Sequence, residues 1–141
     1  MSQINPEQIE RFMSGQVRCW NSHNKPGLLA LYREVAPAEL NIEYVGRAQQ
    51  ADGWLVIEEM FDKHNHQFRL EVVNTIINGN EAAVHHRNCI VGTSQVIESI
   101  ETYRFGPGTL HVRYFLQPPK DANVNLEQFR GFSAAIPPDA P

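Results

Sequence analysis

The sequence predicts a single α+β domain in which three helices pack inside a strongly curved antiparallel sheet. Apolar residues recur at helical spacing in the first part of the chain, up to about His64. From His66 to Gln117 polar residues instead alternate with β-branched and aromatic ones. Helices and strands that are separated along the chain in this way are typical of the α+β class. The concave side of such a sheet is expected to enclose a cavity.

Helix signals are clearest at the N-terminus. Asn5 is a good N-cap, and Pro6 suits the first helical position. In the third predicted helix, Trp54, Ile57 and Phe61 share one face. The helices are predicted at Pro6 to about Asn21, at about 28–36, and at Trp54 to about His64.

Strand and turn signals fill the remainder of the domain. Asn78-Gly79-Asn80 is predicted to be a hairpin turn, because Asn-Gly favours the positive φ that such turns need. The strands are predicted at Asn41–Val45, His66–Ile77, Glu81–Val91, Gln95–Phe105 and Thr109–Gln117. Residues 1–117 are therefore expected to form the domain, and a Pro-rich C-terminal extension is expected at 118–141.

Composition argues against two classes of partner. The formal net charge is −4 and no run of Lys or Arg stands out, so nucleic acid is not expected as a partner. No apolar stretch approaches the roughly 18 residues of a spanning helix, and the N-terminus lacks the apolar core of a signal peptide.

The two cysteines, Cys19 and Cys89, show no metal-ligand spacing and are expected to be reduced thiols of a cytoplasmic protein.

The terminal hairpin, at 95–117, carries ionisable residues at every second position. With a three-residue loop at 106–108, Glu101 would face Arg113 across the strands, on a mixed face that also holds Tyr103 and His111. A two-residue loop would instead put Glu101 on the face of Val112 and Tyr114. The residues alone leave both registers open.

Histidines are the other candidates for proton transfer. His85 and His86 are neighbours on one strand, so their side chains point to opposite faces. The pair His64 and His66 lies at a helix end without convergent carboxylates, and is read as polar loop residues. No metal site and no cofactor is predicted.

The order and spacing of several segments resemble the nuclear transport factor 2-like superfamily, which includes ketosteroid isomerases, scytalone dehydratase and polyketide cyclases of the SnoaL type. The resemblance implies a cystatin-like, cone-shaped α+β barrel with a deep apolar pocket and a homodimer formed through the outer sheet face. The segments that carry it are CWNSHNKPGLLALY (19–32), NIEYVG (41–46), WLVIEEMF (54–61), INGNEAAVHHRNCIVG (77–92) and IETYRFGPGTLHVRYF (100–115).

The resemblance also implies an orientation. It places Glu101 inside the pocket, where ketosteroid isomerases carry a protonated Asp that donates a hydrogen bond to the substrate oxyanion, and it favours His86 as the inward histidine. Two departures stand out. The position of the isomerase's general-base Asp corresponds to Tyr44 or its neighbour Glu43, and the first helix contains no tyrosine to donate to the oxyanion.

These considerations give a hypothesis for function. The chain is expected to bind a small, largely apolar molecule resembling a polyketide, steroid or terpenoid, and cofactor-free isomerisation, cyclisation or dehydration fits such a pocket. The alternative is a non-catalytic ligand-binding or dimerisation module. The residues expected to be catalytic are Glu101, His86 and Arg113, and those expected to bind substrate are Tyr44, Asn88, Tyr103, Trp54, Phe61 and Trp20.

Overall fold

A computed structural model describes residues 3–46 and 52–117 of the chain. The predicted C-terminal extension, 118–141, lies outside the described residues. Within these residues, three helices and five strands follow one another in the order α1, α2, β1, α3, β2, β3, β4, β5. The α+β class and the curved sheet predicted from the sequence are confirmed.

The helices are α1 (Pro6–Asn21), α2 (Lys25–Val35) and α3 (Gly53–His64). Asn5 caps α1 as predicted: its side chain accepts a hydrogen bond from Gln8 N, and the Gln8 side chain accepts one from Asn5 N. This reciprocal pair is a capping box. Helix α2 begins earlier than predicted, because the Asn24 side chain accepts a 3.0 Å hydrogen bond from Gly27 N. The polar break between the helices is correspondingly short.

The sheet has the strand order β1-β5-β4-β3-β2, and one expectation about it is wrong. Strand β1 pairs parallel with β5, so the sheet is mixed rather than wholly antiparallel. The chain enters β1 beside the β4–β5 turn, where Ala38 N donates to Gly108 O, and β1 therefore runs in the same direction as β5. The strands are β1 (Glu39–Tyr44), β2 (Phe68–Asn78), β3 (Glu81–Ile90), β4 (Val96–Gly106) and β5 (Thr109–Gln117).

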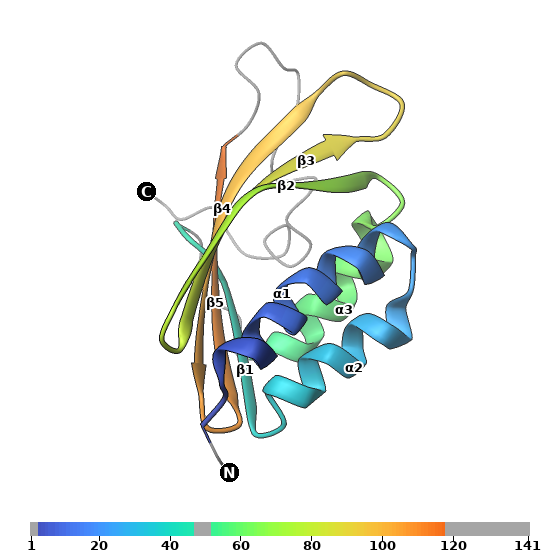
Figure 1. Cartoon of the computed structure of the whole chain (residues 1–141). Coiled ribbons are helices and arrows are strands. Elements are labelled where there is room, and N and C mark those ends of the chain that lie inside the picture. Colours follow the sequence, from blue (N-terminus) through green and yellow to red (C-terminus); the bar gives the residue numbers. More distant parts are fainter. Residues whose placement is uncertain (1–2, 47–51, 118–141) are drawn as a thin grey trace.

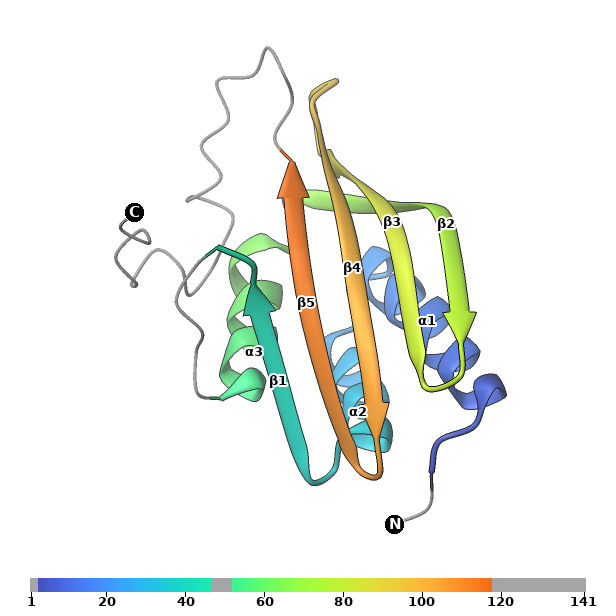
Figure 2. The same ribbon diagram turned by 90° about the vertical axis from the view of Figure 1, so that its left-hand side faces the viewer.

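All three described helices lie on the concave face of the sheet (Figure 1). Seen from the other side, the strands stand in front and the helices behind them (Figure 2). The pairing of β2 with β3 is irregular between Val72 and Asn74, and a bulge of this kind bends a strand and increases its twist. Because all the described helices lie on the concave face, none of them covers the outer face of the sheet.

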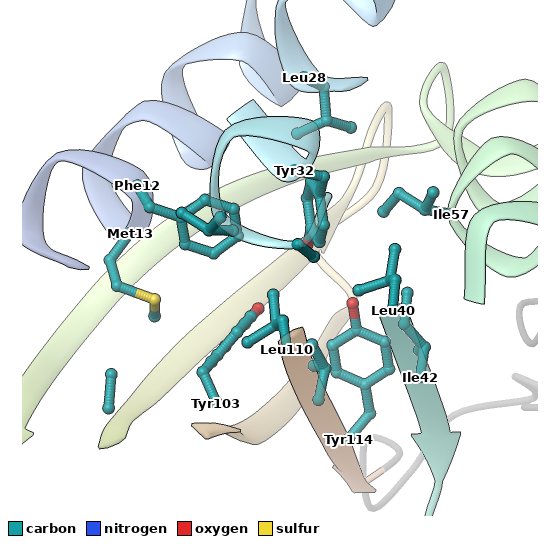
Figure 3. Close-up of a cluster of buried hydrophobic side chains, with 14 of the residues drawn as sticks. Phe12, Met13, Leu28, Tyr32, Leu40, Ile42, Ile57, Tyr103, Leu110 and Tyr114 are labelled. Atoms are coloured by element: carbon teal, nitrogen blue, oxygen red, sulfur yellow. The ribbon is translucent and has the colours of Figure 1, made fainter. Parts of the chain in front are cut away.

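Aromatic side chains fill the core between the helices and the sheet. The ring of Phe12 on α1 meets Tyr32 of α2 edge-on at 4.9 Å and Phe105 of β4 at 5.7 Å. Tyr103 lies 6.0 Å from the same ring (Figure 3). Such edge-to-face pairs add to the free energy gained by burying the rings themselves. These ring contacts therefore join α1 and α2 to β4 across the core.

Candidate active site

A cavity lies between the concave face of the sheet and the helices. It offers about 100 Å³ to the centres of water-sized molecules, which is far more than one buried water occupies. Its apolar wall comes from both layers and includes Trp20, Leu28, Ile57, Met60 and Phe68. All four tyrosines of the chain line it, together with Glu101 and His86. A mostly apolar cavity with a few convergent polar groups is the usual form of a small-molecule site.

The register of the terminal hairpin decides which residues reach this cavity. Gly106 pairs with Thr109, so the loop has two residues, and Glu101 lies opposite Tyr114. The alternative with a three-residue loop is therefore wrong. Glu101 and Tyr103 point inward, while Arg113 and His111 point outward and both contact Glu43.

Arg113 is consequently not part of the cavity. Its Nε atom lies 3.2 Å from Glu43 Oε1, and 45% of its side chain is exposed. The predicted pair of Glu101 with Arg113 does not form. Tyr44 rather than Glu43 is the inward residue at the end of β1, and its ring packs against Tyr114 with centroids 5.3 Å apart.

Glu101 sits at the centre of a hydrogen-bonded cluster. Its Oε1 accepts a 2.7 Å hydrogen bond from the Tyr103 hydroxyl. Its Oε2 accepts one from Ser99 Oγ at 3.1 Å and lies 3.2 Å from His86 Nδ1. Only 10% of the Glu101 side chain and 3% of the His86 side chain are exposed. The two residues therefore form a buried acid–base pair on the cavity wall.

The protonation state of Glu101 follows from these contacts. Burial raises the pKa of its carboxyl, but the charge of His86 and the hydrogen bonds from His86, Tyr103 and Ser99 outweigh burial and lower the pKa below its ordinary value. The group is thus a carboxylate at neutral pH. This differs from the protonated acid that the resemblance implied at this position. Because a carboxylate only accepts hydrogen bonds, His86 Nδ1 carries a proton.

The tyrosines around the pair remain neutral donors. Burial, with the nearby charge of Glu101, raises the pKa of Tyr32, Tyr103 and Tyr114 well above the ordinary value. The Tyr32 hydroxyl donates to Gln16 Oε1 at 2.8 Å. The hydroxyls of Tyr103 and Tyr114 point toward Tyr32 (Figure 3). Several phenol groups from α2, β4 and β5 thus converge in one region of the cavity.

Other predicted substrate-binding residues divide into two groups. Trp20 and Asn88 line the cavity: the Trp20 indole donates to Phe68 O at 3.0 Å, and Asn88 donates to Ile97 O and to Ser99 Oγ. Phe61 instead packs edge-on against Trp20, and neither it nor Trp54 is among the described residues that line the cavity.

The placement of Trp54 and Phe61 differs from the prediction because α3 presents a different face. Ile57, Met60 and His64 of this helix line the cavity, whereas the predicted face held Trp54, Ile57 and Phe61. Arg33 lies over the Trp54 ring at 5.7 Å. The helix is therefore rotated about its axis relative to the expectation.

His64 was not identified as a site residue from the sequence. It is the last residue of α3 rather than a loop residue, and it is only 5% exposed. Its Nδ1 lies 2.9 Å from Gln67 Oε1, and burial lowers the pKa of its imidazole. Ile57, Met60 and His64 have helical spacing, so choosing this face of the predicted helix as the inward one would have indicated its position. Gln16, Ser99 and Tyr114 are further site residues that the sequence did not single out.

Two kinds of feature are not found within residues 3–46 and 52–117. No group of three or more His, Cys, Asp and Glu side chains is placed to hold a metal ion. No helix there is long and apolar enough to cross a membrane. Both cysteines are free thiols.

Comparison with known proteins identifies the fold by structure alone. No protein-family model and no curated protein matches the sequence. A nuclear transport factor 2-like protein of unknown function from Burkholderia xenovorans LB400 matches with a TM-score of 0.62 at 13% identity, over 87% of this chain and 93% of that one.

Two further solved structures carry the names of enzymes. A candidate SnoaL-like polyketide cyclase from Jannaschia sp. CCS1 has a TM-score of 0.58 and 13% identity, over 83% of this chain and 92% of that chain. A candidate ketosteroid isomerase from Kribbella flavida DSM 17836 has a TM-score of 0.61 and 14% identity, over 86% of each chain. The part of the chain that the structure describes, with three helices on the concave face of a curved five-stranded sheet, has the fold of the nuclear transport factor 2-like superfamily.

Proposed function

We propose that the protein binds a small, uncharged and largely apolar carbonyl compound, such as a polyketide-, steroid- or terpenoid-like molecule, and catalyses its isomerisation, cyclisation or dehydration without a cofactor. The observation that carries the proposal is the buried pair of His86 and Glu101 on the wall of an apolar cavity. The shared fold of a candidate polyketide cyclase and a candidate ketosteroid isomerase supports it.

The first step is removal of a proton from a carbon next to the carbonyl group. When His86 is neutral with its proton on Nδ1, Nε2 bears the lone pair, and it has no hydrogen-bond partner among the described residues. Nε2 takes the proton, the electron pair of the C–H bond forms a carbon–carbon double bond, and the π pair of the carbonyl group moves onto its oxygen. Glu101 stabilises the resulting imidazolium, and return of the proton to another carbon completes an isomerisation.

A donor to the developing oxyanion is the second requirement. The neutral hydroxyl of Tyr114 lies in the same cavity and can turn to donate there. Tyr32 and Tyr103 are less suited, because their hydrogens are already given to Gln16 and Glu101. Donors that are fixed before the reaction contribute more than water does, since they need no reorganisation.

The charges of the residues that line the cavity favour an uncharged substrate. None of the described residues that line the cavity is Lys or Arg, and Glu101 is ionised there. An anionic ligand would lose its hydration without gaining a cationic partner beyond His86. Aromatic and aliphatic walls suit an uncharged skeleton instead.

The test is hydrogen–deuterium exchange at the carbon next to the carbonyl of hydrophobic ketones, followed by NMR in D₂O. Ketones are first selected by thermal shift against matched carboxylic acids of the same skeleton. We expect exchange with the wild-type protein, and its loss in His86→Ala and Glu101→Gln. His111→Ala, which removes a histidine of the outer face, is the control. Exchange that survives in both cavity variants would refute the assignment of the base.

A second candidate function is binding without turnover. Both carboxylate oxygens of Glu101 are already satisfied by protein donors, as they would be in a purely structural cluster. Ketones that shift the melting temperature but show no exchange would favour this function.

We also propose that a second copy of the chain covers the outer sheet face. Large apolar side chains are exposed there, with exposed fractions of 51% for Val73, 45% for Ile100 and 38% for Phe115. They line one open groove, whose rim carries both signs of charge in the contact of Glu98 with His85 and Arg87. Apolar residues beside charges of both signs would allow this patch to face its own copy across a two-fold axis.

Light scattering at several concentrations tests this association. Ile100→Lys is expected to shift the protein to the monomer. Leu55→Lys, at an apolar residue of α3 that is 54% exposed, should leave the mass unchanged. A wild-type protein that is monomeric at high concentration would contradict the proposal.

A further inference from the structure

Asn88 is held by two protein acceptors rather than left free for a ligand. Its Nδ2 donates to the backbone oxygen of Ile97 at 2.8 Å and to Ser99 Oγ at 3.0 Å. Because a backbone oxygen only accepts, the contact with Ile97 fixes which way the Asn88 amide is turned. Both amide hydrogens are then in use, and one of them points at Ser99.

The hydroxyl of Ser99 connects Asn88 to Glu101. A hydroxyl has one hydrogen, and Ser99 Oγ already accepts from Asn88, so its hydrogen goes to Glu101 Oε2 at 3.1 Å. Ser99 is 2% exposed, and water therefore does not compete for either contact. The same Oε2 atom accepts from His86 Nδ1.

Strand register is what brings these side chains together. Asn88 pairs with Ile97 and His86 with Ser99 across β3 and β4. Residues two apart on a strand share a face, so His86, Asn88, Ser99 and Glu101, which together we call the relay, line the concave side as two adjacent rows. A one-residue slip would turn all of them outward.

We propose that Asn88 and Ser99 are positioning residues, which act through Glu101 to keep the proton of neutral His86 on Nδ1 and its lone pair on Nε2, facing the cavity. The hydrogen bonds from Asn88 to Ser99 and from Ser99 to Glu101 run in one direction, and the series ends at the carboxylate, which also accepts from the imidazole. This inference rests on the proposed function, since it explains how His86 is prepared to act as a base.

Few charged or titratable groups among the described residues face Glu101. They are His86 from β3 and Tyr103 from β4 by direct contact, and Tyr32 from α2 and Tyr114 from β5 through their proximity in the cavity. Burial raises the pKa of Glu101, whereas the charge of His86 and the hydrogen bonds, that from Ser99 among them, lower it. Removing the Ser99 donor should therefore raise that pKa.

NMR titration tests the relay without any substrate. The chemical shift of the Glu101 carboxyl carbon gives the midpoint of the titration of that group. The chemical shifts of the two imidazole nitrogens of His86 show which of them carries the proton. We expect the wild-type protein to show Nδ1 protonated in neutral His86. Ser99→Ala and Asn88→Ala should each shift the Glu101 midpoint upward, while Asn74→Ala, at an exposed asparagine on β2, should not.

A double-mutant cycle separates a relay from two independent effects. Because Asn88 acts only through Ser99, Asn88→Ala should add no further shift in the Ser99→Ala background. Asn88→Asp keeps the shape but offers an acceptor, so it should turn the Ser99 hydrogen away from Glu101 and shift the midpoint further than Asn88→Ala. The two Asn88 variants alone suffice for the test if Ser99→Ala does not fold.

Additive shifts, an unchanged midpoint in Asn88→Ala, or a proton on Nε2 of the wild-type histidine would each overturn the relay. These outcomes are distinct from failure of the proposed function. A confirmed relay without exchange of ketone protons would refute only the activity. His86-dependent exchange with an unmoved Glu101 midpoint would refute only the relay.

Discussion

Replacing His86 with leucine should reverse the way that Glu101 makes stability depend on pH. In the wild-type protein the pKa of this carboxyl is lowered, because the charge of His86 and the hydrogen bonds outweigh burial. A lowered pKa contributes stability that is present above the unfolded value, about 4.3, and is lost as the pH falls through the folded value. In His86→Leu burial dominates and the folded pKa rises above the unfolded one. The contribution of Glu101 then improves as the pH falls.

The size of the effect follows from burial. Only 10% of the Glu101 side chain is exposed, and the substitution leaves its charge with the two hydroxyl donors, Ser99 and Tyr103. Removing a hydrogen-bond donor from a buried charged group typically costs about 1.5–3 kcal/mol. That is a large part of the roughly 5–15 kcal/mol that stabilises a domain. For a chain of this length each kcal/mol corresponds to about 3–5 °C, so the melting temperature should fall by roughly 5–15 °C near pH 8.

Urea unfolding at pH 8 and near pH 4.5 measures the difference directly. The loss in free energy of unfolding should be largest at pH 8 and clearly smaller at the lower pH, where the lone carboxyl can take up a proton. His85→Leu is the control: its side chain is 36% exposed and faces Glu98 on the outer side, so its loss should cost only about 0–1 kcal/mol. A cost below about 1 kcal/mol for His86→Leu at pH 8, or an equal cost at both pH values, would refute the reasoning.

Three further substitutions test other contacts by chemical denaturation. Tyr103→Phe removes the 2.7 Å hydrogen bond to the Glu101 carboxylate and should cost about 1.5–3 kcal/mol at neutral pH; a cost below 0.5 kcal/mol would mean that the bond is replaced by another donor. Gly53→Ala would place a Cβ 2.3 Å from the Leu40 backbone oxygen, where α3 meets β1, and should destabilise by about 1–3 kcal/mol; unchanged stability would show that α3 can shift freely. Asn5→Ala breaks the capping box of α1 and should cost about 1 kcal/mol, whereas Asn5→Asp, which keeps the acceptor oxygen, should cost less.

Sequence was sufficient for the helices and strands because their signals are local. The Asn5–Pro6 start of α1 and the turn beginning at Asn78 lie where the residues predict them. No local signal of this kind determined the orientation of the terminal hairpin. It depended on whether the loop after Phe105 has two residues or three, and a one-residue difference exchanges the two faces of a strand. That difference separates Glu101 from Arg113 and brings it to His86 instead.

Other parts of the site required knowledge of packing. His64 reaches the cavity because α3 extends to it and turns the face of Ile57 and Met60 inward, while Phe61 packs behind Trp20. Helical spacing alone allows either face, since both carry large apolar residues. The aromatic content of the cavity was predictable in part: Trp20, Tyr44 and Tyr103 line it as expected, whereas Trp54 and Phe61 do not.

The state of Glu101 shows why position in a fold does not decide chemistry. The resemblance implied an acid that donates its own proton to a substrate oxygen. Here three donors converge on the carboxylate, and His86 supplies a charge, so the group stays ionised despite its burial. An ionised carboxylate has no hydrogen to donate, and it cannot stabilise an oxyanion directly. In the proposed reaction, such stabilisation would come from a tyrosine hydroxyl, and Glu101 would act on the substrate through His86. The neighbours of this carboxylate therefore fit the proposed base at His86 better than an acid at Glu101 itself.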